Sequence, residues 1–131
     1  MRARQARRVL HADALFDFAL GLLLVLAVWD DLFLALGLPP ARPAIYAEIA
    51  GVLLWGYAYL LWVAPDYAGL TRRVATVTAA ANVAAGALLL LWVASGPGGM
   101  EVLGGVLIVA GALALLGFAY LEARIAGGHV Y

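Results

Sequence analysis

The 131-residue chain contains no cysteine and no lysine, and it has few charged residues of either sign. The absence of cysteine excludes disulfide bonds, thiolate metal sites and cysteine nucleophiles. Charged residues make up 12% of the chain, against roughly 25% in soluble domains, whereas 66% of its residues are hydrophobic. A soluble fold of this length could not bury so much apolar surface, so the composition predicts an integral membrane protein of one domain.

Four apolar segments each approach the roughly 20 residues that a helix needs to cross a bilayer. Proline near a start and glycine or proline after an end mark the expected helix boundaries. The connections are short, so consecutive helices should pack antiparallel. We therefore predict an all-α fold, a single membrane-embedded domain over 1–131 that forms an antiparallel four-helix bundle. The predicted helices span about 12–34, 44–64, 73–95 and 100–122.

The arginines are distributed unevenly between the two ends of the predicted bundle. The positive-inside rule places the arginine-rich end, with both termini, in the cytoplasm. The first apolar run is longer than a signal-peptide core and contains Asp17, so we expect it to remain as a helix. Because all eight cations are arginine, as is typical of GC-rich genomes, we predict a multi-pass protein of a bacterial inner membrane. The arginine-rich end carries Arg2, Arg4, Arg7, Arg8, Arg72, Arg73 and Arg124, and the other end carries Arg42.

Small residues are concentrated in the last three predicted helices. Lipid provides no hydrophobic drive for helix association, so close backbone approach at small residues has to supply it. We expect these residues to form helix contacts in the bundle or in a homo-oligomer. They are Gly51, Gly56, Ala75, Ala79, Ala80, Ala81, Ala84, Ala85, Gly86, Gly104, Gly105, Ala110, Gly111, Ala114 and Gly117.

The two predicted hairpins resemble each other in sequence. Such a likeness has two explanations: duplication of one hairpin, or convergence of low-complexity apolar sequence. The spacing between the matched segments differs in the two copies, which favours convergence. The matched segments are 48–51 with 101–104, 56–60 with 117–121, and the leucine-rich run after Gly21 with that after Gly86.

Asp17 is the most informative polar residue of the chain. At 1.5 Å per residue it lies about 8 Å inside the inner boundary of the first predicted helix. An ionisable group at that depth is costly and needs a hydrogen-bond donor or a proton. It shares one helix face with Asp13. Candidate donors at similar depth are Tyr57, Tyr59, Thr76, Thr78 and Asn82, and Arg72 or Arg73 could approach from the interface.

A second polar stripe is predicted on the second helix, where Glu48, Trp55, Tyr59 and Trp62 share a face. Glu48 is level with Asp30 and Asp31, and three carboxylates at one rim would attract cations. Solvated helix ends would explain these acids equally well, just as a structural hydrogen bond would explain Asp17. The candidate ligand or proton site therefore comprises Asp17, Asp13, Tyr57, Tyr59, Asn82, Glu48 and Trp55.

Catalytic and cofactor motifs are not found in the sequence. No nucleophile–base pair, P-loop or dinucleotide fingerprint is present, so we expect neither an enzyme nor a cofactor. His11 and His129 have no carboxylate at a ligand spacing, so we expect no metal site.

The segments 12–17, 36–39, 48–51 and 56–65 resemble those of small uncharacterised four-helix membrane proteins of bacteria. That resemblance implies the fold but no activity. Four short helices with a carboxylate in the first are also similar to the small multidrug resistance transporters. That family has glutamate where Asp17 stands, and its other aromatic and small-residue motifs are missing here, which puts a shared function in doubt.

Three functions are compatible with these features. The first is a non-enzymatic membrane protein that binds a small or lipid-like ligand, or a partner, inside the bundle. The second is a small proton- or cation-coupled transporter that acts as a homo-oligomer, with Asp17 as the titrating group. The third is an accessory subunit of a larger membrane complex. We expect membrane lipid as a partner, and no nucleic acid.

The arginine distribution predicts the topology directly. A reporter fused after Tyr131 should stay in the cytoplasm, and one inserted near Pro40 should be exported, because seven of the eight arginines lie on the side of the termini. Alkaline phosphatase and fluorescent-protein fusions measure both positions. An exported carboxy-terminal reporter would reverse the orientation.

Overall fold

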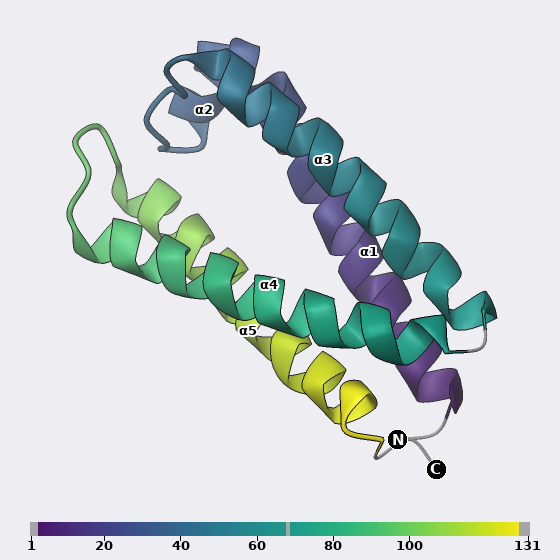
Figure 1. Ribbon diagram of the computed structural model, residues 1–131. Helices are drawn as coiled ribbons and strands as arrows, with labels where there is room; N and C mark the ends of the chain where they lie inside the picture. Colours follow the sequence, from purple (N-terminus) through teal and green to yellow (C-terminus); the bar gives the residue numbers. More distant parts are fainter. Residues whose placement is uncertain (1–2, 68, 129–131) are drawn as a thin grey trace.

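The computed structural model describes residues 3–67 and 69–128, which form helices and connecting loops without a strand (Figure 1). Four spans are long and apolar enough to cross a membrane: Ala3–Val28, Ala44–Asp66, Leu70–Ala94 and Val102–Ala126. The predicted all-α, multi-pass membrane fold is thereby confirmed. In chain order the elements are α1 (Ala3–Val25), η1 (Leu26–Val28), α2 (Asp30–Ala35), α3 (Ala44–Val63), η2 (Ala64–Asp66), α4 (Leu70–Ala94) and α5 (Val102–Ala126).

The helix bounds differ from the predicted ones at the charged ends. The first helix begins at Ala3 rather than near residue 12, and the last continues to Ala126 rather than ending near 122. Arginine favours helix, so the charged segments mark the membrane boundary without ending the helix. The predicted span 12–34 is also divided, because Trp29 adopts extended backbone angles (φ −91°, ψ 91°) between η1 and α2.

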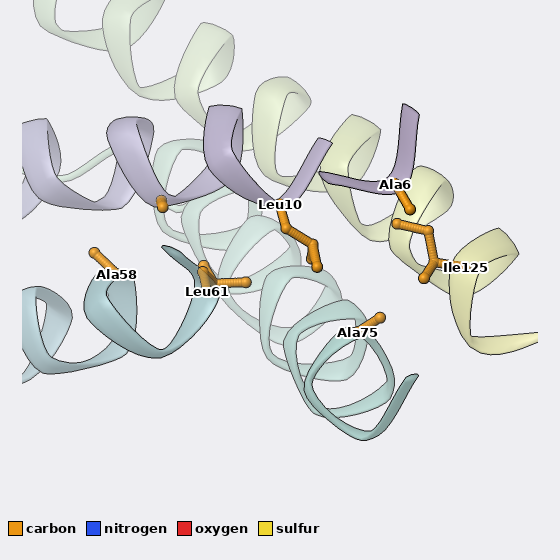
Figure 2. Packing of buried hydrophobic residues seen from close by; sticks show 7 residues of the cluster. Ala6, Leu10, Ala58, Leu61, Ala75 and Ile125 are labelled. Atoms are coloured by element: carbon orange, nitrogen blue, oxygen red, sulfur yellow. The ribbon is translucent and has the colours of Figure 1, made fainter. Parts of the chain in front are cut away.

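The helices are arranged as two antiparallel hairpins, α1 with α3 and α4 with α5, and most helix contacts lie within a hairpin. The hairpins converge at the end that holds the start of α1 and the end of α5, and they diverge toward α2 (Figure 1). An apolar core at the convergent end takes side chains from all four long helices (Figure 2). Its buried members are Ala6, Leu10, Ala14, Ala58, Leu61, Ala75 and Ile125.

Glycines set the separation of the helices within each hairpin. A Cβ atom added to Gly51 would lie 2.5 Å from the carbonyl oxygen of Gly21 on the facing helix. In the second hairpin, a Cβ atom on Gly86 would lie 2.9 Å from the Leu116 side chain. Both helix pairs therefore approach at distances that no larger residue allows, as the small-residue pattern predicted.

Other small residues do not face a neighbouring helix. A Cβ atom added to Gly56, Gly111 or Gly117 would meet no atom within 4 Å, and Ala80, Ala81 and Ala84 are exposed. These residues therefore form no helix contacts of the bundle, and the alternative, that they form contacts in a homo-oligomer, stays a prediction. Successive residues of a helix rotate by about 100°, so a run of small residues turns most of its members away from any one partner.

A second connection between the hairpins lies at the divergent end. The backbone N–H of Glu101, just before α5, donates to the carbonyl oxygen of Gly37 at 2.9 Å. Gly37 has a positive φ of 69°, a conformation that favours glycine. A Cβ atom on Gly104 would collide with the same Gly37 carbonyl group. The loop after α2 is thus held against the first turn of α5.

The glycine contacts predict opposite effects for two neighbouring substitutions on α3. Gly51→Ala should lower the free energy of unfolding by about 1–3 kcal/mol, because the new methyl group forces α1 and α3 apart. Gly56→Ala should leave stability unchanged or raise it by up to about 1 kcal/mol, because the site is open and alanine favours helix. Thermal unfolding in detergent measures both. Effects of the same sign and size would contradict the assigned helix faces.

Candidate functional site

Three carboxyl groups from two helices are buried at the junction of the hairpins. Asp13 and Asp17 lie one turn apart on the same face of α1, and Glu122 lies on α5. Asp13 and Glu122 have no exposed surface, and Asp17 retains 1%. We call Asp13, Asp17 and Glu122 the carboxyl cluster. Because α1 and α5 belong to different hairpins, the cluster lies across their interface.

Asn82 on α4 connects two members of the carboxyl cluster. Its Nδ2 atom donates to Asp13 Oδ2 at 3.0 Å and to Glu122 Oε2 at 3.0 Å. One buried amide group therefore links three helices. An amide supplies donors without adding charge, so it leaves the negative charge of the cluster uncompensated.

Asp13 and Glu122 accept from the same Asn82 nitrogen, so their carboxyl groups lie close to each other. An ionised carboxylate only accepts hydrogen bonds, so neither group can donate to the other unless one of them carries a proton. Within the described chain, Asp13 Oδ1 and Glu122 Oε1 have no donor from the protein. A proton held between the two carboxyls would serve both oxygens.

Asp17 and Tyr57 form the other part of the site. Tyr57, on α3, packs against the apolar core at the convergent end, and its hydroxyl is buried. Among the described residues, Asp17 Oδ2 and the Tyr57 hydroxyl have no hydrogen-bond partner. Thr78 is buried beside Tyr57 and Glu122, but its hydroxyl donates within its own helix, to Val74 O at 2.9 Å.

No cation neutralises the carboxyl cluster in the part of the chain that the structure describes. The two ion pairs there join Arg7 to Asp66 at 2.7 Å and Arg42 to Asp30. Arg72 and Arg73 are exposed on α4, so the predicted approach of either to Asp13 or Asp17 is not observed. Burying several like charges without a counter-ion is strongly unfavourable, so the three carboxyls cannot all be ionised together.

The structure brings four of the seven candidate residues together: Asp13, Asp17, Tyr57 and Asn82. The other three lie elsewhere. Tyr59 is 67% exposed and points away from the cluster. Trp55 donates to the Phe18 carbonyl at 3.1 Å and covers Gly21. Glu48 is half-buried near the start of α3, at the other end of the bundle.

Glu122 is the site residue that the sequence reasoning missed. The predicted fourth helix ends at about residue 122, which places Glu122 at its boundary, but α5 continues past it to Ala126. A signal was present in the spacing. Leu115, Ala119 and Glu122 follow one another at intervals of four and three residues, which places Glu122 on the same helix face as two buried positions.

Neither a search for metal sites nor a comparison with known proteins adds a residue to the candidate site. Among residues 3–67 and 69–128, no three His, Asp or Glu side chains are grouped to hold a metal ion. His11 instead stacks on Trp62, with ring centroids 4.1 Å apart, and Arg2 and His129 lie outside the described residues. Comparison with known protein families, with curated proteins and with solved structures found no match to this chain.

The bridging amide predicts a stability effect at Asn82. Asn82→Leu should lower the free energy of unfolding by about 1–3 kcal/mol, because Asp13 and Glu122 lose their common donor while staying buried. The matched control is Val83→Leu at the next residue, whose side chain is exposed, and which should change stability by less than about 0.5 kcal/mol. Equal melting of the two variants in detergent would show that the amide contributes nothing.

Proposed function

We propose that this protein is a non-enzymatic membrane protein that binds and releases protons at the carboxyl cluster and couples this change of charge to the packing of its two hairpins. A small proton-coupled transporter works in this way. The observation that supports the proposal is the burial of Asp13, Asp17 and Glu122 between the hairpins without a cation. Ionisable groups inside the membrane are costly and commonly mark proton pathways.

The size of the site favours a proton as its ligand. Asp13, Asp17 and Glu122 are almost completely buried, so a larger ligand could contact them only after the hairpins had separated. The surface clefts at residues 28–32 and beside Arg8 and Arg124 are lined by no residue of the carboxyl cluster. A proton needs no cavity, so it can bind a carboxyl of the cluster without that separation.

The arrangement of the hairpins supports the coupling. Each hairpin is packed internally through close glycine contacts, whereas fewer contacts join the two hairpins to each other. Loss of protons from the cluster adds negative charge to this weaker interface. Like charges repel, so the hairpins should separate there while each keeps its internal packing.

Proton binding is measured by potentiometric titration of the detergent-solubilised protein from about pH 5 to about pH 9. Asp17→Asn and Glu122→Gln should each bind fewer protons than the wild type over this range, because each removes one buried titrating group. Asp31→Asn is the matched control, because it makes the same substitution at an exposed carboxyl outside the cluster. Curves identical to wild type for the two cluster variants would rule out proton binding there.

The same pH range tests the coupling, because the cysteine-free sequence allows spin labels to be placed at single introduced cysteines. Labels at the exposed residues Leu53 on α3 and Leu88 on α4 report on the distance between the hairpins. That distance should increase with pH in the wild type and not in Asp17→Asn/Glu122→Gln. Labels at Leu22 and Leu53, both in the first hairpin, should show no change. A constant distance between the hairpins would leave proton binding without a conformational effect.

A further inference from the structure

The first helices of the two hairpins share a sequence register. When residue 4 is aligned with residue 69, ten of the 25 positions up to residues 28 and 93 are identical. The run Arg7-Arg8-Val9 then matches Arg72-Arg73-Val74, outside the apolar part where chance identities are commonest. The identical pairs are 7/72, 8/73, 9/74, 14/79, 19/84, 21/86, 23/88, 24/89, 26/91 and 28/93.

Burial follows the same register, although it is a property of the fold and not of composition. With this shift of 65 residues, every buried residue of α4 has a buried counterpart on α1. With a shift of 61 residues, every buried residue of α3 has a buried counterpart on α5. The buried pairs are Leu10/Ala75, Asp13/Thr78, Ala14/Ala79, Asp17/Asn82, Gly21/Gly86, Gly51/Ala112, Ala58/Ala119 and Leu61/Glu122.

The closest helix contacts are equivalent as well. A Cβ atom on Gly21 would meet the Trp55 side chain at 2.7 Å and the carbonyl oxygen of Gly51 at 2.8 Å. A Cβ atom on Gly86 would meet the Leu116 side chain at 2.9 Å and the carbonyl oxygen of Ala112 at 3.1 Å. Trp55 and Leu116, like Gly51 and Ala112, are 61 residues apart, so the two glycines occupy the same position in two similar hairpins.

We propose that the chain is a tandem duplication of one two-helix membrane unit, with 3–66 and 70–127 as the two equivalent units. Both units begin at the same end of the bundle (Figure 1), which is the relation of parallel repeats in membrane proteins. The likeness of 48–51 to 101–104 has a different shift and is out of register. That mismatch, and not convergence, explains the unequal spacing of the matched segments.

The duplication also explains the composition of the carboxyl cluster. Each of its acids has an uncharged counterpart in the other unit: Thr78 for Asp13, Asn82 for Asp17, and Leu61 for Glu122. Two identical units would place every acid twice at one interface, which would increase the repulsion between ionised carboxyl groups there. Divergence has kept one acid of each pair and made Asn82 a donor to two of the acids that remain, Asp13 and Glu122. This consequence rests on the proposed function, whereas the duplication does not.

Two circular permutants of the full chain test whether the hairpins are separate units. In both, the original termini are joined by the same glycine–serine linker. The first permutant begins at Gly69 and ends at residue 68, which leaves both units intact and exchanges their order. The second begins at Gly98 and ends at Pro97, which divides the unit 70–127 between α4 and α5.

The first permutant should remain monodisperse in detergent and melt close to the wild type, and the second should melt at a lower temperature and aggregate more. Because the linker is the same, equal behaviour of the two permutants would overturn the proposal, whether both are stable or both are not. A second permutant more stable than the first would overturn it too. Neither result depends on proton binding, so failure here is distinguishable from a failed titration.

Discussion

Asn82 donates its amide group to Asp13 on α1 and to Glu122 on α5, and thereby joins the two hairpins inside the membrane. The association of these hairpins has no general hydrophobic drive, since lipid is as apolar as the helix surfaces that face it. What remains is specific contact: this hydrogen-bond network, the apolar core at the convergent end, and the backbone bond from Glu101 to Gly37 at the divergent end. Removing the amide would leave two acceptors buried without a donor, so the network also determines which residues can occupy the interface.

Helices pack more closely within each hairpin than between the two hairpins. Gly21 faces Gly51, and Gly86 faces Ala112, at distances where a single added methyl group has no room. At Gly51 the nearest atom is the backbone oxygen of Gly21, which no side-chain rotation can move, and at Gly86 the nearest is the Leu116 side chain. Helix contacts inside each hairpin are therefore closer than those between the hairpins. The interface between the hairpins instead contains the buried carboxyl groups and the Asn82 amide. Under the proposed function, the net charge of these carboxyls changes with the number of bound protons. Under the proposed function, a change of charge would therefore act between the hairpins rather than within one.

The sequence predicted the fold well and the site in part, and the reasons are physical. Apolar runs of spanning length are a direct consequence of the bilayer, so the four helices could be recognised without a structure. Asp17 and Asp13 could be recognised because a spanning helix needs apolar residues, and an acid inside it is costly. Glu122 did not, because the helix continues through the charged residues that resemble its end. Tyr59 was chosen for its depth, but depth does not determine direction: Tyr57 and Tyr59 are two residues apart and point to different sides of α3.

The direction in which a residue points also explains why small residues alone did not predict the helix contacts. Gly51 and Gly56 lie on one helix and look alike in the sequence, yet only Gly51 faces α1. A helix rich in glycine and alanine carries small residues on every face, and the contacts select one face only after the partner helix is placed. The internal register was accessible from the sequence alone, since Arg7-Arg8-Val9 and Arg72-Arg73-Val74 align with Gly21 and Gly86. The likeness between 48–51 and 101–104 has a different residue offset, and it therefore pointed away from that register.

The identity of the bridging residue bears on what the cluster can do. An arginine at position 82 would supply more donors than asparagine, but its permanent charge would hold at least one acid ionised at all times. An amide donates equally to a carboxylate and to the carbonyl oxygen of a protonated carboxyl. Asn82 therefore keeps its two hydrogen bonds through a change in protonation and leaves the net charge of the cluster to be determined by protons. Because the described arginines lie at the ends of the helices or in loops, no fixed charge inside the bundle competes with that control.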